Sequence, residues 1–173
     1  MRRLAYLDQQ VFQWITKHLC CPDQFSVKVF KWISRSGDGY LYILVATLLY
    51  FYDPEHGALF FYTALLAYSI EIPLYVVLKH LFKRKRPCDL LYNLKSHIVP
   101  ADKFSLPSGH TAAAFLMATI VAQYYPTLTL FVFVWASLIG ISRIVLRVHF
   151  PLDVIIGASL GLCMAISAMV ILG

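Results

Sequence analysis

Three short motifs hold the polar residues of this sequence whose types and spacing could do chemistry. They are Lys79 with Arg86-Pro87, Pro107-Ser108-Gly109-His110, and Ser142-Arg143 with His149 and Asp153. Lys79, Arg86 and Arg143 supply positive charge, and a guanidinium group presents a planar fork of donors that matches phosphoryl oxygens. We therefore expect these three cations to form a phosphate clamp.

The other members of the motifs supply the remaining parts that phosphoryl transfer needs. Ser108 and Gly109 are expected at the start of a helix, where backbone N–H groups and the helix dipole favour an anion. Asp153 is expected in the first turn of a helix, from which its carboxylate can reach the His149 imidazole and fix its tautomer, so that His149 becomes an oriented nucleophile. His110, on the first turn of its helix, is placed to act as the general acid that protonates the departing oxygen.

The composition of the chain indicates whether this chemistry takes place in a soluble or in a membrane protein. Of the 173 residues, 60% are hydrophobic and 14% are charged, whereas soluble domains have roughly 45–50% and about 25%. The mean hydropathy is +0.68. These values exclude disordered, collagen-like and coiled-coil chains, and they predict one integral membrane domain over residues 1–173. The net charge of +6 could suit nucleic acid, but the sequence has no recognition module, so we expect a phosphorylated lipid in the bilayer as partner and no nucleic acid.

The apolar stretches between the motifs predict five membrane spans. They cover residues 40–52, 57–82, 108–125, 127–146 and 151–173. The first is short for a hydrocarbon core of roughly 30 Å, and Glu71 and Pro73 interrupt the second. Two amphipathic helices, residues 4–19 and 25–33, are expected to lie in the headgroup region, so that residues 1–39 are interfacial. The predicted fold class is all-α: a polytopic membrane helix bundle with about five transmembrane helices, preceded by amphipathic interfacial helices.

Successive spans cross the membrane in opposite directions. With five spans at the predicted positions, the three motifs all lie on the same face of the membrane. That face also receives all 15 Lys and Arg residues, and the positive-inside rule makes it cytoplasmic. Because some of these cations serve chemistry, a periplasmic face is the alternative. The N-terminus has no apolar run long enough for a signal peptide, so we expect the mature chain to begin near Met1.

Several other polar residues have structural interpretations. Lys83, Arg84 and Lys85 are typical of a topology anchor beside a membrane span. Glu71 is an acid inside a span; we expect it to serve packing or hydrogen bonding, with a direct chemical role as the alternative. The remaining histidines and the cysteines show no catalytic or zinc-ligand spacing, so no metal site is expected. These residues are His18, His56, His80, His97, Cys20, Cys21, Cys88 and Cys163.

Together, the three motifs resemble the signature of the type 2 phosphatidic acid phosphatase (PAP2) family of integral membrane lipid phosphatases, over residues 40–173. The resemblance implies a two-step phosphoryl transfer that uses neither a metal nor another cofactor. It implies that His149, supported by Asp153, forms a phosphohistidine, and that His110 protonates the lipid leaving group and later activates water. The phosphate-binding residues that it implies are Lys79, Arg86, Ser108, Gly109 and Arg143.

The resemblance also implies a multi-pass protein of the bacterial inner membrane that hydrolyses a lipid phosphomonoester or diphosphate. A cytoplasmic site favours phosphatidylglycerol phosphate or phosphatidic acid, and a periplasmic site, as in familiar bacterial relatives, favours undecaprenyl diphosphate or the 1-phosphate of lipid A. The alternatives are phosphate transfer to another acceptor and non-catalytic binding of anionic lipid; the related vanadium haloperoxidases are disfavoured because they are soluble. Many bacterial members have six spans, and this sequence is expected to lack the first. The oligomeric state is left open.

Overall fold

A computed structural model describes residues 2–18, 24–91, 94–100 and 102–172, and every regular element in these ranges is helical. The elements are α1 (Arg2–His18), α2 (Gln24–Ser36), α3 (Gly39–Tyr52), α4 (Gly57–Phe82), α5 (Pro87–Leu90), α6 (Gly109–Tyr124), the 3-10 helix η1 (Pro126–Leu128), α7 (Thr129–Val145) and α8 (Pro151–Leu172). The predicted all-α class is confirmed. Cys88 and Cys163 are free thiols, whereas Cys20 and Cys21 lie outside the described residues.

The membrane character of the bundle is confirmed as well. The stretches Gly57–Leu90, Pro126–Val145 and Pro151–Leu172 are long and apolar enough to span a bilayer. Of the other two predicted spans, α3 is apolar but has 14 residues, and α6 has 16, which is about 24 Å of helix. The span count of five therefore stays a prediction.

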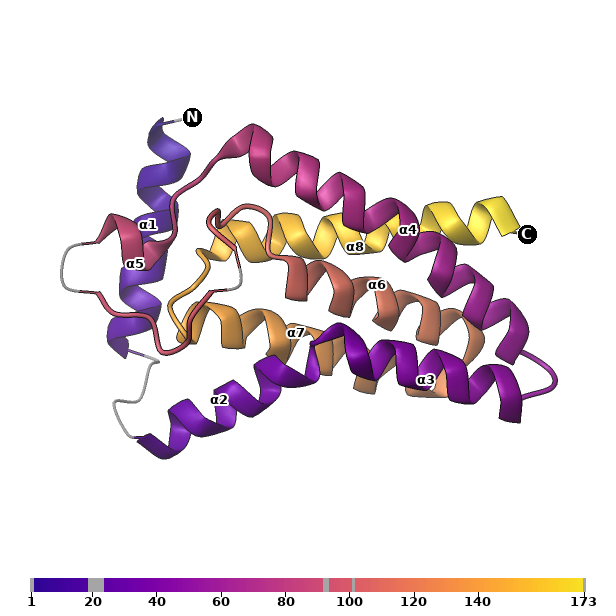
Figure 1. Cartoon of the computed structure of the whole chain (residues 1–173). Helices are drawn as coiled ribbons and strands as arrows, with labels where there is room; N and C mark the ends of the chain where they lie inside the picture. The colour runs from indigo at the N-terminus through magenta and orange to yellow at the C-terminus, as the bar shows by residue number, and fades with distance from the viewer. Residues whose placement is uncertain (1, 19–23, 92–93, 101, 173) are drawn as a thin grey trace.

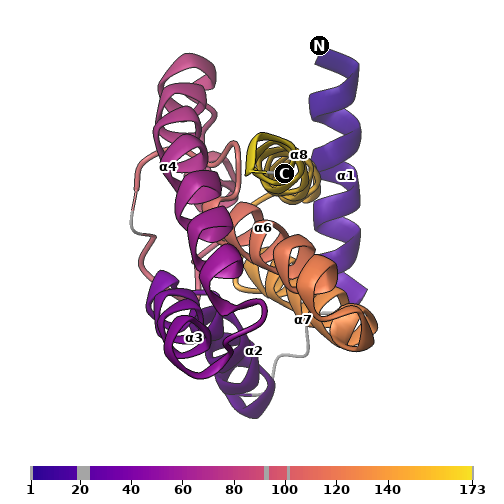
Figure 2. The same cartoon turned by 90° about the vertical axis from the view of Figure 1, so that its right-hand side faces the viewer.

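Helix α6 occupies the centre of the bundle, with α8, α7 and α4 packed around it (Figures 1 and 2). Its sequence explains this position, because its buried residues are mostly small or aliphatic. Where α6 meets α8, a Cβ on Gly161 would lie 2.1 Å from the Ala112 carbonyl oxygen, and one on Gly157 would lie 2.5 Å from the Ser108 carbonyl oxygen. These glycines let the two backbones touch, which brings the start of α6 against the first turn of α8.

The ends of the helices that carry the three motifs gather at one end of the bundle (left in Figure 1), and the C-terminus lies at the other. Helix α1 lies across this gathered end rather than along the bundle (Figures 1 and 2). It is held by Phe12, which is fully buried and packs edge-on against Phe150 at 5.2 Å between ring centroids. Tyr6 and Trp14 on the same helix are exposed. This orientation suits the interfacial helix that we expect, although its depth in a bilayer stays a prediction.

The contact between α6 and α8 yields a test of the packing. In Gly161→Leu the added side chain would meet the Ala112 and Leu116 backbone atoms, which cannot rotate away. We expect overpacking to lower the free energy of unfolding by about 2–3 kcal/mol, measured as a lower melting temperature in detergent. The control is Gly39→Ala, because no heavy atom lies within 4 Å of a Cβ there. Equal melting temperatures for Gly161→Leu and the unaltered protein would contradict this packing.

Candidate active site

The three motifs meet at the gathered end of the bundle. Lys79 lies in the last turn of α4, Arg86 precedes α5, Ser108 precedes α6, Arg143 lies near the end of α7, and Asp153 lies in the first turn of α8. His149 lies in the turn between α7 and α8. All six side chains belong to buried residues. The structure thus brings together residues that are up to 74 positions apart, from Lys79 to Asp153.

Asp102, which the sequence did not single out, joins two of the cations. Its Oδ1 atom accepts from Lys79 Nζ and from Arg86 Nη2, both at 2.5 Å, and its Oδ2 atom accepts from the Tyr75 hydroxyl at 2.7 Å. Burial alone would raise the pKa of Asp102, but the hydrogen bonds and positive charge around it lower the pKa to about 2. Asp102 is therefore a permanent carboxylate that holds one half of the clamp.

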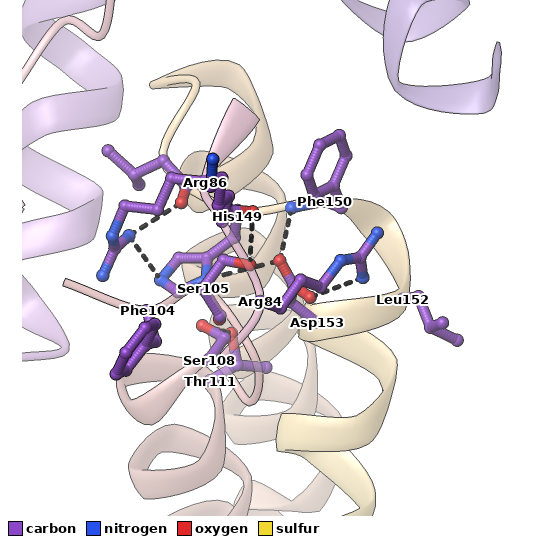
Figure 3. A network of polar contacts seen from close by, with 12 residues as sticks. Arg84, Arg86, Phe104, Ser105, Ser108, Thr111, His149, Phe150, Leu152 and Asp153 are labelled. Atoms are coloured by element: carbon purple, nitrogen blue, oxygen red, sulfur yellow. Dashed lines mark hydrogen bonds and ion pairs between the residues drawn. The ribbon is translucent and has the colours of Figure 1, made fainter. Parts of the chain in front are cut away.

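His149 is fixed by backbone and by Arg86 (Figure 3). Its Nδ1 atom lies 2.7 Å from the Ser105 carbonyl oxygen, which can only accept, so this nitrogen carries the proton. The other nitrogen, Nε2, then holds a lone pair and lies 3.4 Å from Arg86 Nη1, which also donates to the Val148 carbonyl at 2.7 Å. Burial and then the charges of Arg143, Arg86 and Lys79 hold the pKa of His149 well below its usual range. His149 is thus neutral at physiological pH and able to act as a nucleophile.

Asp153 departs from the expectation that it fixes the His149 tautomer. Its Oδ2 atom lies 3.7 Å from His149 Nδ1, and instead accepts the Phe150 N–H at 2.8 Å (Figure 3). The physical reason is that Asp153 sits in the first turn of α8, where free backbone N–H groups are the nearest donors. Asp153 thus holds the turn that carries His149, whereas the Ser105 carbonyl sets the tautomer.

Arg84 was expected to be a topology anchor, and the structure gives it contacts inside the protein that this expectation did not include. Its guanidinium donates to Asp153 Oδ1 at 2.7 Å and to Asp8 Oδ2 at 2.5 Å, and it lies over the Phe150 ring at 4.4 Å. Asp8 lies on α1 and also accepts the Leu152 N–H at 2.9 Å. Arg84 therefore connects the interfacial helix to the acid beside His149, and the basic run in which it lies gave no signal of this.

Ser108 differs from its expected role, whereas the expected role of Gly109 in binding phosphate stays a prediction. The Ser108 N–H donates to the Asp153 carbonyl oxygen at 3.0 Å, and the Ser108 hydroxyl pairs with that of Thr111 at 2.9 Å. Ser108 is fully buried behind the site, so it fixes α6 against α8 instead of presenting its own N–H to an anion. Gly109 lines the cavity, and a Cβ there would lie 2.8 Å from the Tyr75 ring.

His110 and Arg143 face the cavity and contact the α2–α3 region. His110 Nε2 lies 2.9 Å from Asp38 Oδ1, and Arg143 Nη1 donates to the Ser34 hydroxyl at 2.5 Å. The Arg143 Nε atom is buried without a hydrogen-bond partner among the described residues. Asp38, just before α3, lies in the region 1–39 that was expected only to be interfacial. The residues before the first apolar stretch thus supply part of the site.

Part of this site lines one end of a cavity of about 750 Å³. Lys79, Ser108 and Asp153 are not among the lining residues. Its polar end is formed by Arg86, Asp102, His110, Arg143 and His149, and the rest is lined mainly by apolar side chains of α3, α4 and α6. His18, His56, His80 and His97 do not line it. No group of three or more His, Cys, Asp or Glu side chains within the described ranges could hold a metal ion.

The Arg84 contacts predict a long-range effect on activity. In Arg84→Met, Asp153 and Asp8 would lose their shared cation, so the turn that presents His149 should loosen. We expect kcat to fall by about 10- to 100-fold, as for residues that orient a catalytic group. Steady-state phosphate release by the purified protein measures this. The matched control is Lys85→Met, which removes an exposed cation from the same run; an equal loss in both variants, or no loss in Arg84→Met, would contradict the role of Arg84.

The environment of His149 predicts a pH effect on stability. Its pKa in the folded protein lies below the ~6.5 of an exposed imidazole, so the unfolded chain binds the proton first as pH falls. Stability should therefore be complete above about pH 6.5 and decrease as pH falls toward the folded pKa. Glutamine does not titrate. We therefore expect the melting temperature of His149→Gln to fall less between about pH 7 and about pH 5 than that of the unaltered protein. If the melting temperatures of His149→Gln and of the unaltered protein fell equally, the imidazole of His149 in the folded protein would have an ordinary pKa. Asp102, with a pKa of about 2, stays ionised over this range.

The chain is similar to known proteins of one superfamily. The family model of the PAP2 superfamily matches residues 55–173. Phosphatidylglycerophosphatase B of Bacillus subtilis (strain 168) is 32% identical over 133 residues; the match covers 70% of this chain and 61% of that protein, so the chain spans less than two thirds of this relative.

Two solved structures share the fold over nearly the whole chain. The crystal structure of Aquifex aeolicus LpxE matches with a TM-score of 0.81 and 29% identity, covering 94% of both chains. That of a transmembrane PAP2 type phosphatidylglycerolphosphate phosphatase from Bacillus subtilis matches with a TM-score of 0.79 and 24% identity, covering 99% of this chain and 87% of the other. The likeness to this second structure is one of fold. The chain belongs to the PAP2 superfamily.

Proposed function

We propose that this protein is a membrane lipid phosphatase that hydrolyses a lipid phosphomonoester or diphosphate through a phosphohistidine on His149. The observation that carries the proposal is the cavity itself. Its polar end presents a neutral imidazole beside cations, and its remainder continues as an apolar surface between α3, α4 and α6. A molecule that fills it has a phosphate at one end and an apolar chain at the other.

The charge at the polar end suits a phosphomonoester. Lys79, Arg86 and Arg143 carry three positive charges, and the Asp102 carboxylate, which contacts the first two, offsets one of them. Because the Asp38 carboxylate also lines the cavity beside His110, these groups leave a net charge of +1 for the phosphate, or +2 when His110 is protonated. Arg143 Nε, buried without a partner among the described residues, supplies a donor for a phosphoryl oxygen, because a guanidinium fork binds such oxygens in pairs.

In the first step the Nε2 lone pair of His149 forms a bond to phosphorus while the bond from phosphorus to the lipid oxygen breaks. His110 gives its proton to that oxygen as the lipid leaves. His110 Nε2 lies 2.9 Å from Asp38 Oδ1, so this carboxylate can hold the ring in position at the polar end of the cavity.

In the second step water attacks phosphorus as His110 takes a proton from it, the N–P bond breaks, and phosphate leaves. Asp153 offsets the positive charge on His149 in between. Uncatalysed phosphate esters react so slowly that these groups must together supply ~20 kcal/mol or more.

The location of the site follows from the charge of the same end of the bundle. We propose a protein of the bacterial inner membrane whose active-site end faces the cytoplasm, because the Lys and Arg residues gather there. Labelling of Ser96→Cys in intact cells with a membrane-impermeant reagent tests this. Protection supports a cytoplasmic site and phosphatidylglycerol phosphate or phosphatidic acid as substrate; labelling favours undecaprenyl diphosphate or the 1-phosphate of lipid A.

The proposed activity is tested by phosphate release from those four lipids in mixed micelles, with His149→Ala as the blank. We expect one lipid to be turned over far faster than the others, and turnover to persist in EDTA, because none of the steps uses a metal. Loss of activity in EDTA that a divalent ion restores would contradict the metal-independent mechanism. If no lipid released phosphate above the blank, hydrolysis would be contradicted. The alternatives would then be phosphate transfer to another acceptor and lipid binding without catalysis.

A further inference from the structure

One cation of the phosphate clamp lies behind an acidic residue. Lys79 does not line the cavity and its side chain is only 5% exposed, whereas Asp102 lines the cavity and its side chain is 36% exposed. The Lys79 ammonium group donates to Asp102 Oδ1 at 2.5 Å and to the Phe104 carbonyl oxygen at 3.0 Å. A molecule in the cavity therefore meets Asp102 on this side and does not reach Lys79.

The Asp102 carboxylate makes the contacts that a phosphoryl group would make with the clamp. Its Oδ1 atom accepts from two cations, Lys79 and Arg86, and its Oδ2 atom accepts from the Tyr75 hydroxyl at 2.7 Å. Carboxylate and phosphate oxygens are bound by the same charged donors in proteins. The carboxylate and a substrate phosphate would therefore compete for Lys79 and Arg86.

Arg86 has no nitrogen atom without a protein acceptor. Its Nε donates to the Asp102 carbonyl oxygen at 3.1 Å, its Nη1 to the Val148 carbonyl oxygen at 2.7 Å, and its Nη2 to the Asp102 carboxylate. Arg143 differs, because its Nε is buried without a partner among the described residues. A phosphate that binds both Arg86 Nη2 and Lys79 Nζ must take the place of the carboxylate.

An exchange of the two anions keeps the buried cations neutralised at every stage. Lys79 and Arg86 are both buried, and buried charges without a counter-ion are unfavourable. The carboxylate supplies the counter-ion in the free protein, and phosphate can supply it in the complex. Asp102 is partly exposed on the cavity side, so its side chain is the one that can turn away without unpacking the helices.

We propose that the Asp102 carboxylate holds the phosphate position on Lys79 and Arg86 in the free protein, that the substrate phosphate displaces it, and that its return displaces the product phosphate. The inference rests on the proposed function, since it assumes that these cations bind a phosphoryl group. Asp102 is then a positioning residue that weakens phosphate binding and speeds the release of phosphate.

The test measures binding of inorganic phosphate to the purified protein in detergent, both as inhibition of turnover and as a rise in melting temperature. Asp102→Asn keeps the size of the side chain and an acceptor oxygen but removes the charge. We expect it to bind phosphate about tenfold more tightly, as expected when a charged hydrogen-bond partner no longer competes. Both KM for the lipid and kcat should fall, because the product leaves more slowly. The matched control is Asp89→Asn, which alters an exposed carboxylate on α5 and should change neither.

The double variant Lys79→Met, Asp102→Asn separates exchange from simple charge repulsion. It removes both partners of the ion pair, so no unpaired charge is left between them. If phosphate takes the place of the carboxylate it contacts Lys79, and the double variant should lose the tighter binding of Asp102→Asn. If the double variant bound phosphate as tightly as Asp102→Asn, Lys79 would not contact phosphate and the exchange would be overturned.

The other outcomes separate the exchange from the proposed function. Weaker or equal binding of phosphate by Asp102→Asn, in a protein that hydrolyses lipid, would show that the carboxylate only positions the cations; the exchange would be overturned and the phosphatase activity would stand. Tighter binding by Asp102→Asn in a protein that hydrolyses none of the four lipids would support the exchange and overturn the proposed function. Absence of phosphate binding to every variant would overturn both.

Discussion

The site depends on burying several cations close together at the end of a membrane bundle. Each buried charge would cost several kcal/mol if it were left without partners. Asp102 offsets this cost for Lys79 and Arg86, while the carbonyl groups of Asp102, Phe104 and Val148 accept their remaining N–H groups. The loop that carries these acceptors is thereby tied to α4 and to the α7–α8 turn. The same contacts place Arg86 beside His149 and set the shape of the phosphate-binding end.

A second set of contacts fixes Asp153, the acidic residue beside His149. Arg84 lies between Asp153 and Asp8, so one guanidinium balances two carboxylates from different helices. Asp153 in turn holds the Phe150 N–H, and its backbone carbonyl accepts from Ser108 at the start of α6. The interfacial helix α1 and the central helix α6 are therefore both connected to the turn that presents His149. Movement of α1 at the membrane surface would act on this turn through Arg84 and through the direct contacts that Asp8 and Phe12 make with Leu152 and Phe150.

The sequence predicted the parts of this arrangement that follow from composition and from the order of the motifs. High hydropathy and the lengths of the apolar stretches were enough for an all-α membrane bundle, and the odd number of these stretches placed the motifs at one end. Asp102, Asp38 and Arg84 could not be found in this way. Their roles arise from loop and interfacial segments that fold back over the site, and neither periodicity nor spacing encodes such contacts. Ser108 was misjudged for a related reason, because the approach of α8 at Gly157 buries it.

The central claim is that the uncharged Nε2 atom of His149 is the nucleophile. It is tested most directly by mixing the purified protein with a lipid carrying radiolabelled phosphate, stopping the reaction within one turnover in alkali, and mapping the labelled residue. A phosphohistidine on His149 predicts an alkali-stable, acid-labile phosphate on this residue, absent from His149→Ala. Label on another residue, or turnover without any protein-bound phosphate, would contradict it.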